Sequence, residues 1–220
     1  MILDGLTEDQ QQVLLGSMFG DGGCTMPKDG KVAYFEESHK ASDSDYLAWK
    51  LSVLYASNLF KSPVVLPRNA NKPEEGVYIR SRCDRGITDL YNAFYVDGRK
   101  IVTPYLLSLL LPLGIAVWYM DDGNLSKEGH ITLSTESYTY EENVSVRDWI
   151  LSTFHARFKI YPKVNRHGPP YYRLVTSDKV NASIFLNVVK PYCAKGMEKK
   201  FTPIRFSQLR SLKPYYRLQE

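Results

Sequence analysis

Residues 14–22 read Leu-Leu-Gly-Ser-Met-Phe-Gly-Asp-Gly, and residues 115–123 read Ile-Ala-Val-Trp-Tyr-Met-Asp-Asp-Gly. Each stretch is apolar up to an Asp-Gly pair, which is typical of the end of a helix. The acids that we align are Asp21 in the first stretch and Asp122 in the second. Two similar helices that both end in an acid predict two copies of one unit.

Two lysines follow these aspartates at nearly equal distances. Lys100 lies 79 positions after Asp21, and Lys200 lies 78 positions after Asp122. The matched interval strengthens the prediction of an internal duplication, because it repeats both an acid and a base. Arg99 and Lys199 are adjacent alternatives for the basic residue of each copy.

Composition allows several kinds of protein but excludes few. The chain has 220 residues and 44% hydrophobic content, which suffices for one large domain or for two small halves that share a core. A net charge of +4 permits a nucleic-acid partner without requiring one. The polar, acidic residues 1–12 differ from a signal peptide. Reduced thiols in an intracellular protein are expected at three widely spaced cysteines, Cys24, Cys83 and Cys193.

The uncharged segment at residues 101–120 is long enough to cross a bilayer. Pro104, Pro112 and Gly114 interrupt it, and two acids follow it at once. We therefore predict two shorter buried helices that meet near Pro112, and no membrane association.

The expected elements follow the same order twice. The first half is expected to contain a helix that begins after Thr7 and ends at Asp21, and further elements at residues 31–36, 46–60, 64–66, 76–82 and 87–95. The second half is expected to contain elements at residues 113–120, 129–135, 141–158, 159–164, 171–176 and 182–189. This order indicates an α+β fold with halves at residues 1–105 and 106–220.

The two expected motif helices bring carboxylates together. Gly16 and Gly20 lie four residues apart, so one face of the first helix allows another backbone to approach closely. If the helices pack side by side, Asp21 and Asp122 emerge at the same end. Paired carboxylates repel unless a cation lies between them, and oxygen ligands favour Mg²⁺. The alternative is two ordinary helix ends without a metal, and the matched lysines argue against it.

Further residues around the motifs carry a family resemblance. Residues 118–123, preceded by Leu111-Pro112-Leu113, and the segment at residues 191–201 resemble motifs of LAGLIDADG homing endonucleases in their single-chain, two-motif form. The resemblance implies a pseudo-twofold fold of duplicated αββαββα halves with two central packed motif helices. It also implies two antiparallel four-stranded saddle-shaped sheets that hold a long DNA target through its major groove.

The resemblance also implies a metal site. Asp21 and Asp122 carry over as metal ligands, assisted by the backbone carbonyls of Gly20 and Asp121. The implied cofactor is Mg²⁺, with Mn²⁺ or Ca²⁺ as alternative occupants of the same sites. Asp121 stands where the family has a small residue, and we leave open whether its side chain faces solvent or serves as an alternate ligand.

Four more residues are implied as catalytic. Lys100 and Lys200 carry over as the basic residues, which polarise water or stabilise developing negative charge. Glu37 and Glu136 are the candidates for the strand residue that holds the water network in the family.

DNA contacts are expected from basic, polar and aromatic side chains on strands and turns. Arg80 and Arg82 are expected to share a strand face because they are two residues apart, and the turn at Arg166-His167 is expected to reach phosphates. The candidates are Lys28, Lys31, Arg68, Arg80, Arg82, Lys127, His130, Lys163, Arg166, His167, Tyr171 and Arg173.

The function expected from these features is that of a monomeric, Mg²⁺-dependent, site-specific double-strand DNA endonuclease. It would act inside the cell on host genomic or organellar DNA, with the compartment left open. Two alternatives on the same fold stay open: an RNA maturase that assists intron splicing, and a DNA-binding regulator that does not cleave. Residues 119–122 also resemble the catalytic tetrapeptide of reverse transcriptases, but the chain is too short for such a polymerase, and the apolar lead-in favours a helix.

Overall fold

The computed structural model describes residues 3–28, 30–164 and 170–202. The first half comprises α1 (Glu8–Phe19), β1 (Gly23–Thr25), β2 (Tyr34–His39), α2 (Ser44–Tyr55), β3 (Leu66–Pro67), β4 (Val77–Arg80) and α3 (Arg85–Phe94). The second half comprises α5 (Pro112–Asp122), β7 (Gly123–Leu125), β8 (Ile131–Leu133), α6 (Tyr140–Phe154), β9 (Phe158–Lys163), β10 (Tyr171–Thr176) and α7 (Lys179–Val189). Between the halves lie β5 (Tyr95–Val96), β6 (Arg99–Lys100) and α4 (Pro104–Ser108).

Both halves have the same sheet topology. The strand order is β1-β2-β4-β3 in one four-stranded sheet and β7-β8-β10-β9 in the other, and every pair of neighbours is antiparallel. The predicted α+β fold of two αββαββα halves is thereby confirmed. The predicted division at residue 105 lies inside α4 and stays a prediction.

Two helices end four or five residues earlier than predicted, and the backbone explains both errors. The helix predicted to reach residue 60 ends at Tyr55, and the chain then turns at Asn58, whose φ is 60°. The helix predicted to reach residue 158 ends at Phe154, because His155 adopts the left-handed conformation with a φ of 58°. Hydrophobic spacing does not report such a left-handed residue.

The segment at residues 101–120 forms two short helices, as predicted. Thr103 accepts a hydrogen bond at the start of α4, and Pro112 occupies the first turn of α5, where a missing N–H costs nothing. Within the described parts of the chain, no helix has both the length and the apolar character needed to cross a bilayer.

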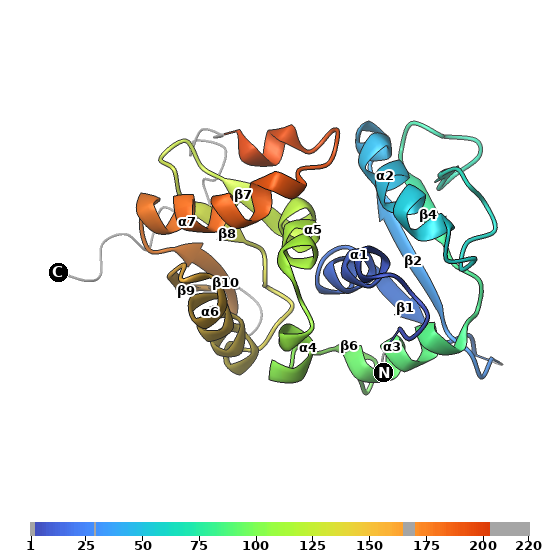
Figure 1. Ribbon diagram of the computed structural model, residues 1–220, viewed down its shortest axis with the longest axis horizontal. Helices are drawn as coiled ribbons and strands as arrows, with labels where there is room; N and C mark the ends of the chain where they lie inside the picture. The colour runs from blue at the N-terminus through green and yellow to red at the C-terminus, as the bar shows by residue number, and fades with distance from the viewer. Residues whose placement is uncertain (1–2, 29, 165–169, 203–220) are drawn as a thin grey trace.

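Helices α1 and α5 lie side by side at the centre of the molecule, with the N-terminal half on one side and the C-terminal half on the other (Figure 1). Close packing depends on glycine, because a Cβ added to Gly16 would lie 2.4 Å from the carbonyl oxygen of Gly114 and 2.6 Å from Val117 Cβ. The rings of Phe19 and Trp118, one from each helix, pack with centroids 4.9 Å apart. The small face predicted for the first helix is therefore its contact with the second.

Candidate active site

The two aligned aspartates lie at the ends of the central helices. Asp21 follows the C-cap Gly20 of α1, and Asp122 is the last residue of α5. The Asp21 side chain is 45% exposed, whereas Asp122 is half-buried and accepts a hydrogen bond from Trp118 Nε1 at 3.3 Å. Burial raises the pKa of Asp122 to about 8, and the charges of Asp21 and Asp121 add to the effect. The charge of Lys200 and the hydrogen bond of Trp118 act to lower this pKa, but they do not outweigh burial.

Lys100 reaches back to the residues on both sides of Asp21. Its Nζ donates to the carbonyl oxygens of Gly22, at 2.6 Å, and Gly20, at 3.4 Å. Burial lowers the pKa of this lysine. The ammonium thus lies beside the carboxylate-bearing residue at the end of α1.

Lys200 repeats this arrangement in the second half. Its Nζ donates to the carbonyl oxygens of Asp121, at 2.8 Å, and Gly123, at 3.0 Å, so that it brackets Asp122. Burial lowers the pKa of this lysine too. The repetition of the contact supports the alignment of Asp122, rather than Asp121, with Asp21.

The adjacent basic residues point elsewhere. Arg99 forms an ion pair with Glu142 at 2.8 Å, and Lys199 forms one with Asp43. Sequence spacing left two basic residues in each copy as candidates. The side-chain directions favour Lys100 and Lys200.

Asp121 lies in a buried charged cluster, so the alternative in which its side chain faces solvent is wrong. Lys50 Nζ lies 2.9 Å from both of its carboxylate oxygens and 2.5 Å from Glu37 Oε1, and all three side chains are fully buried. Tyr46 donates to Asp121 Oδ1 at 2.8 Å, and Ser17 Oγ accepts from Lys50 at 2.9 Å. Burial raises the pKa of Asp121 to about 6, against the charge of Lys50.

His39 connects this buried cluster to Asp21. Its Nε2 lies 2.6 Å from Glu37 Oε1, and its Nδ1 lies 3.7 Å from Asp21 Oδ2. Burial acts to lower the pKa of His39, but the hydrogen bond and charge of Glu37 outweigh it and raise the pKa. Asp21, His39 and Asp121 each offer one ligand atom, and the three atoms lie within 4.8 Å of one another.

Sequence reasoning missed Lys50 and His39. A signal existed for Lys50, because it falls three residues after Leu47 and four before Leu54, on the apolar face of α2. A lysine at such a position is buried only with a partner, but the partner Asp121 is 71 residues away. No comparable local signal distinguishes His39.

The two candidate glutamates have different surroundings. Glu37 is buried and accepts a hydrogen bond from Lys50. Burial acts to raise the pKa of Glu37, but the charge of Lys50 and the hydrogen bonds of His39 and Lys50 outweigh it and lower the pKa to about 2. Glu136 is half-buried and forms an ion pair with Arg173. Their catalytic roles stay predictions.

The expected DNA-contacting residues lie mostly on exposed surfaces. Lys163 and Tyr171 are cross-strand partners and share a sheet face with Arg173, and Lys163 Nζ lies 5.3 Å from the centre of the Tyr171 ring. His130 is half-buried, with Nδ1 3.3 Å from the carbonyl oxygen of Thr176. The exposed candidates are Lys28, Lys31, Arg68, Arg80, Arg82 and Lys127. Arg166 and His167 lie outside the described residues.

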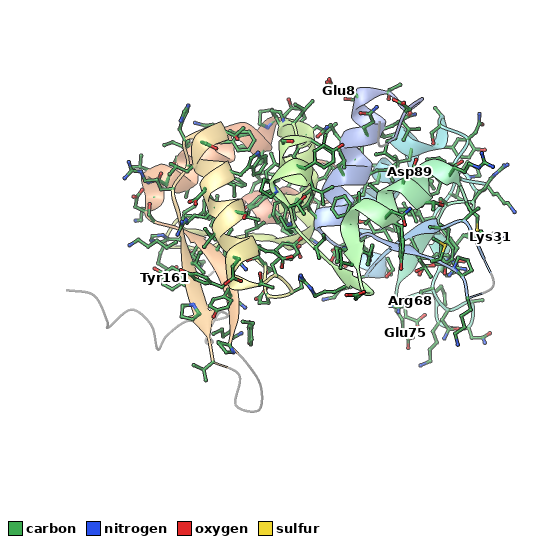
Figure 2. The ribbon with its side chains drawn as sticks, turned by 90° about the horizontal axis from the view of Figure 1, so that it is seen from below. Glu8, Lys31, Arg68, Glu75, Asp89 and Tyr161 are labelled. Atoms are coloured by element: carbon green, nitrogen blue, oxygen red, sulfur yellow. The ribbon has the colours of Figure 1, made fainter. Side chains whose placement is uncertain are left out.

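A cavity of about 510 Å³ opens at the end of α1. Asp21, His39 and Lys200 line it together with Arg68 and Glu75. Figure 2 shows Arg68, Glu75 and Tyr161 on the side of the molecule opposite to Glu8, which begins α1. The aspartate end of α1 therefore faces the same side as these residues of both halves.

The chain is similar in sequence to several known proteins. The sequence model of the LAGLIDADG DNA endonuclease family matches residues 11–182. The DNA endonuclease I-ChuI of Chlamydomonas applanata is 22% identical over 208 residues, which are 89% of this chain and 95% of that protein. The protein RecA of Mycolicibacterium flavescens is 27% identical over 225 residues, and the chain spans about half of its length, 50%.

Two solved structures share the fold. The homing endonuclease I-WcaI, bound to its DNA recognition sequence, matches with a TM-score of 0.74 at 20% identity, over 90% of this chain and 88% of that chain. I-DmoI, in complex with DNA and Mn, matches with a TM-score of 0.53 at 13% identity, over 83% of this chain and 96% of that chain. The family model covers most of the sequence and the duplicated halves have the fold of these enzymes, so the chain belongs to the LAGLIDADG DNA endonuclease family.

Proposed function

We propose that this chain is a site-specific double-strand DNA endonuclease that acts as a monomer, with one half-site for each DNA strand. The observation that carries the proposal is the repeated contact at the helix ends. Lys100 brackets Asp21, and Lys200 brackets Asp122, at the ends of two packed helices. Cleavage of both strands of a DNA duplex requires hydrolysis of two phosphodiester bonds, and two copies of the site allow one bond to be hydrolysed at each. The proposed location is inside the cell, with genomic or organellar DNA.

The residues at the helix ends fit a divalent cation. Asp21 and Asp122 would hold it, with the carbonyl oxygens of Gly20 and Asp121 as further donors. These are hard oxygen ligands, which suit Mg²⁺ and also Mn²⁺ or Ca²⁺. The raised pKa of Asp122 supports the fit, since the positive charge of a bound cation would stabilise the ionised form of this buried carboxyl group. When bound, the ion would neutralise the attacked phosphate and stabilise the leaving oxygen.

The lysines supply positive charge that is already in position. Each ammonium is held by two backbone carbonyls beside an aspartate, so little reorganisation is needed when negative charge develops on the phosphate. The basic and aromatic sheet residues, including Lys163 and Tyr171, would bind phosphates and bases. DNA affinity should then fall with salt, with a log–log slope of about −0.9 for each phosphate neutralised.

An RNA maturase is the second candidate. Its support is the cytochrome b mRNA maturase bI2 of Debaryomyces hansenii, which is 22% identical over 203 residues, 89% of this chain and 74% of that protein. A non-cleaving DNA-binding protein is less well supported, because both aspartates and both lysines are present and matched.

The deciding experiment is cleavage of a plasmid library that carries random target sites, with Mg²⁺ and with EDTA. Linearisation of specific members in Mg²⁺ alone supports the endonuclease. Rescue of intron splicing by protein that cuts no member supports the maturase. A salt-independent affinity for DNA would contradict a DNA-directed function.

A further inference from the structure

His39 is held in an orientation that is typical of a metal-binding imidazole. Its Nε2 lies 2.6 Å from Glu37 Oε1, and Glu37 is itself held by Lys50 at 2.5 Å. In the neutral imidazole, a proton on Nε2 that is donated to Glu37 leaves the lone pair of Nδ1 directed away from that carboxylate. Carboxylates orient metal-binding histidines in this manner, by accepting the N–H of the other ring nitrogen.

The other ring nitrogen faces Asp21. His39 Nδ1 lies 3.7 Å from Asp21 Oδ2. Two ligands on one ion with bonds of about 2.1 Å are separated by about 3.0 Å at a right angle and about 3.4 Å at a tetrahedral angle. The observed separation exceeds the right-angle value by about 0.7 Å and the tetrahedral value by about 0.3 Å, and the Asp21 side chain is 45% exposed and therefore has room to turn.

The carboxylate that holds the imidazole also has an unsatisfied oxygen. Glu37 is 1% exposed, and its Oε2 has no hydrogen-bond partner among the described residues. The carboxylate of Asp121 also lies within 4.8 Å of the His39 and Asp21 atoms, although Lys50 and Tyr46 already occupy it. An additional positive charge near Asp21 would therefore be stabilised by the buried acids beneath it.

The other half-site has no counterpart of this arrangement. Gly23 pairs with Glu36 in β2, and Asn124 pairs with Thr132 in β8, so Glu36 and Thr132 correspond. Three residues further along each strand, His39 then corresponds to Thr135. The starts of the following helices, α2 at residue 44 and α6 at residue 140, keep the same offset.

The corresponding residues of the second half cannot hold an ion in this manner. Thr135 is buried, and its hydroxyl lies 2.5 Å from Asn143 Oδ1. By the same offset, Glu37 corresponds to Leu133 and Lys50 to Val146, which are both fully buried and apolar. Among the described residues, the imidazole and its supporting charges therefore belong to the Asp21 half-site alone.

We propose that the two half-sites differ in metal preference, because His39 Nδ1 is a nitrogen ligand of the Asp21 half-site. Imidazole suits first-row transition ions, whereas carboxylate and carbonyl oxygens suit Mg²⁺ and Ca²⁺. The Asp21 half-site then favours Mn²⁺ or Co²⁺ over Mg²⁺, whereas the described residues of the Asp122 half-site offer oxygen ligands. The inference rests on the proposed function only in taking Asp21 as a metal ligand.

The test is pulsed electron paramagnetic resonance on the full chain loaded with Mn²⁺ alone, which detects the nuclear coupling of a bound imidazole nitrogen. The chain has four histidines: His39, His130, His155 and His167. A variant with His130→Gln, His155→Asn and His167→Gln, in which His39 is the remaining histidine, should keep the nitrogen coupling. His39→Gln should lose it, and its affinity for Mn²⁺ should fall by about 10-fold or more. Its affinity for Mg²⁺, measured by competition, should change less than about 3-fold.

The matched control is His155→Asn, an exposed residue at a left-handed position that asparagine tolerates. It should keep both the coupling and the Mn²⁺ affinity. Absence of nitrogen coupling in the wild-type chain overturns the inference, and so does an equal loss of Mn²⁺ and Mg²⁺ affinity in His39→Gln. If His39→Gln fails to fold, the variant that lacks the other three histidines decides alone, because only His39 remains in it to give the nitrogen coupling.

Failure of this inference is distinguishable from failure of the proposed function. One outcome is DNA cleavage in Mg²⁺ that depends on Asp21 and Asp122, with no nitrogen coupling in Mn²⁺. This outcome rejects His39 as a ligand but keeps the endonuclease assignment. Cleavage that is unchanged in both aspartate variants rejects the endonuclease assignment itself.

Discussion

Lys50 Nζ lies 2.9 Å from both carboxylate oxygens of Asp121, so a buried ion pair joins a helix of the first half to the last turn of the central helix of the second. Both side chains are fully buried. The pair lies directly beneath the candidate active site, because Asp121 precedes Asp122 and its backbone carbonyl accepts from Lys200. Stability and catalytic geometry are therefore coupled at this point.

Lys50→Met should destabilise the protein by about 3–5 kcal/mol, because it leaves two buried carboxylates without their cation. The free energy of unfolding from urea titration measures this effect. The matched control is Lys72→Met, which removes an exposed ion pair with Glu75 and should cost less than about 1 kcal/mol. Equal losses in the two variants would show that burial of the Lys50 pair is irrelevant.

Gly16→Ala should destabilise the contact between α1 and α5 by about 1–3 kcal/mol or more, because the added methyl group meets the Gly114 backbone oxygen at 2.4 Å. Chemical denaturation measures the loss. Ser52→Ala, at an exposed position of α2, serves as control and should stay within about 0.5 kcal/mol of wild type. A neutral Gly16→Ala variant would contradict the packing of the central helices.

Asp21→Asn and Asp122→Asn should each abolish double-strand cleavage, because each removes the carboxylate of one half-site. DNA affinity should stay within about 3-fold of wild type, since the sheets supply most contacts. Linearisation of supercoiled target plasmid and gel-shift titration measure the two properties. Wild-type cleavage rates in both variants would reject the assigned site.

Lys100→Ala and Lys200→Ala should slow cleavage by about 10- to 100-fold each, a smaller loss than that of the aspartate variants, because charge stabilisation is reduced but not removed. Single-turnover rates at saturating protein measure the change. Lys195→Ala, whose side chain is 81% exposed and pairs with Asp45, is the control and should cleave at the wild-type rate. A wild-type cleavage rate in both Lys100→Ala and Lys200→Ala would show that these lysines have a structural role and do not contribute to cleavage.

Asp122→Asn should stabilise the metal-free protein at high pH. The pKa of Asp122 is raised in the folded state, from 3.8 to about 8, so the folded chain binds the proton more tightly than the unfolded chain. The stability contributed by this group is present below pH 3.8 and is lost as pH rises toward and through 8. Asparagine cannot ionise, so the variant should exceed wild type by about 1–4 kcal/mol at pH 9.

The measurement is thermal unfolding in EDTA from pH 5 to 9. The advantage of the Asp122→Asn variant should shrink toward pH 5, where wild-type Asp122 is largely protonated in the folded state. A difference that does not change with pH would mean that Asp122 is not held in a desolvated site.

Much of the fold followed from local patterns. The apolar spacing before Asp21 and Asp122 marked both central helices, and Pro112 marked the start of the second. The ends of α2 and α6 were predicted wrongly, because Asn58 and His155 adopt left-handed conformations that hydropathy does not encode.

The sequence by itself determined the duplication and the family, and it predicted the alignment of Asp21 with Asp122, because these depend on residue order and spacing along one chain. Only the tertiary structure decided which basic residues face the helix ends, and that Asp121 is buried against Lys50. It also placed His39 beside Asp21, without a counterpart among the described residues of the second half. The physical reason is distance along the chain: the contacts of Lys50 with Asp121 and of Lys200 with the end of α5 join residues more than 70 positions apart. The Lys50 contact forms only when the two halves pack, and the Lys200 contact forms only when the C-terminal half folds, so no local pattern reports either.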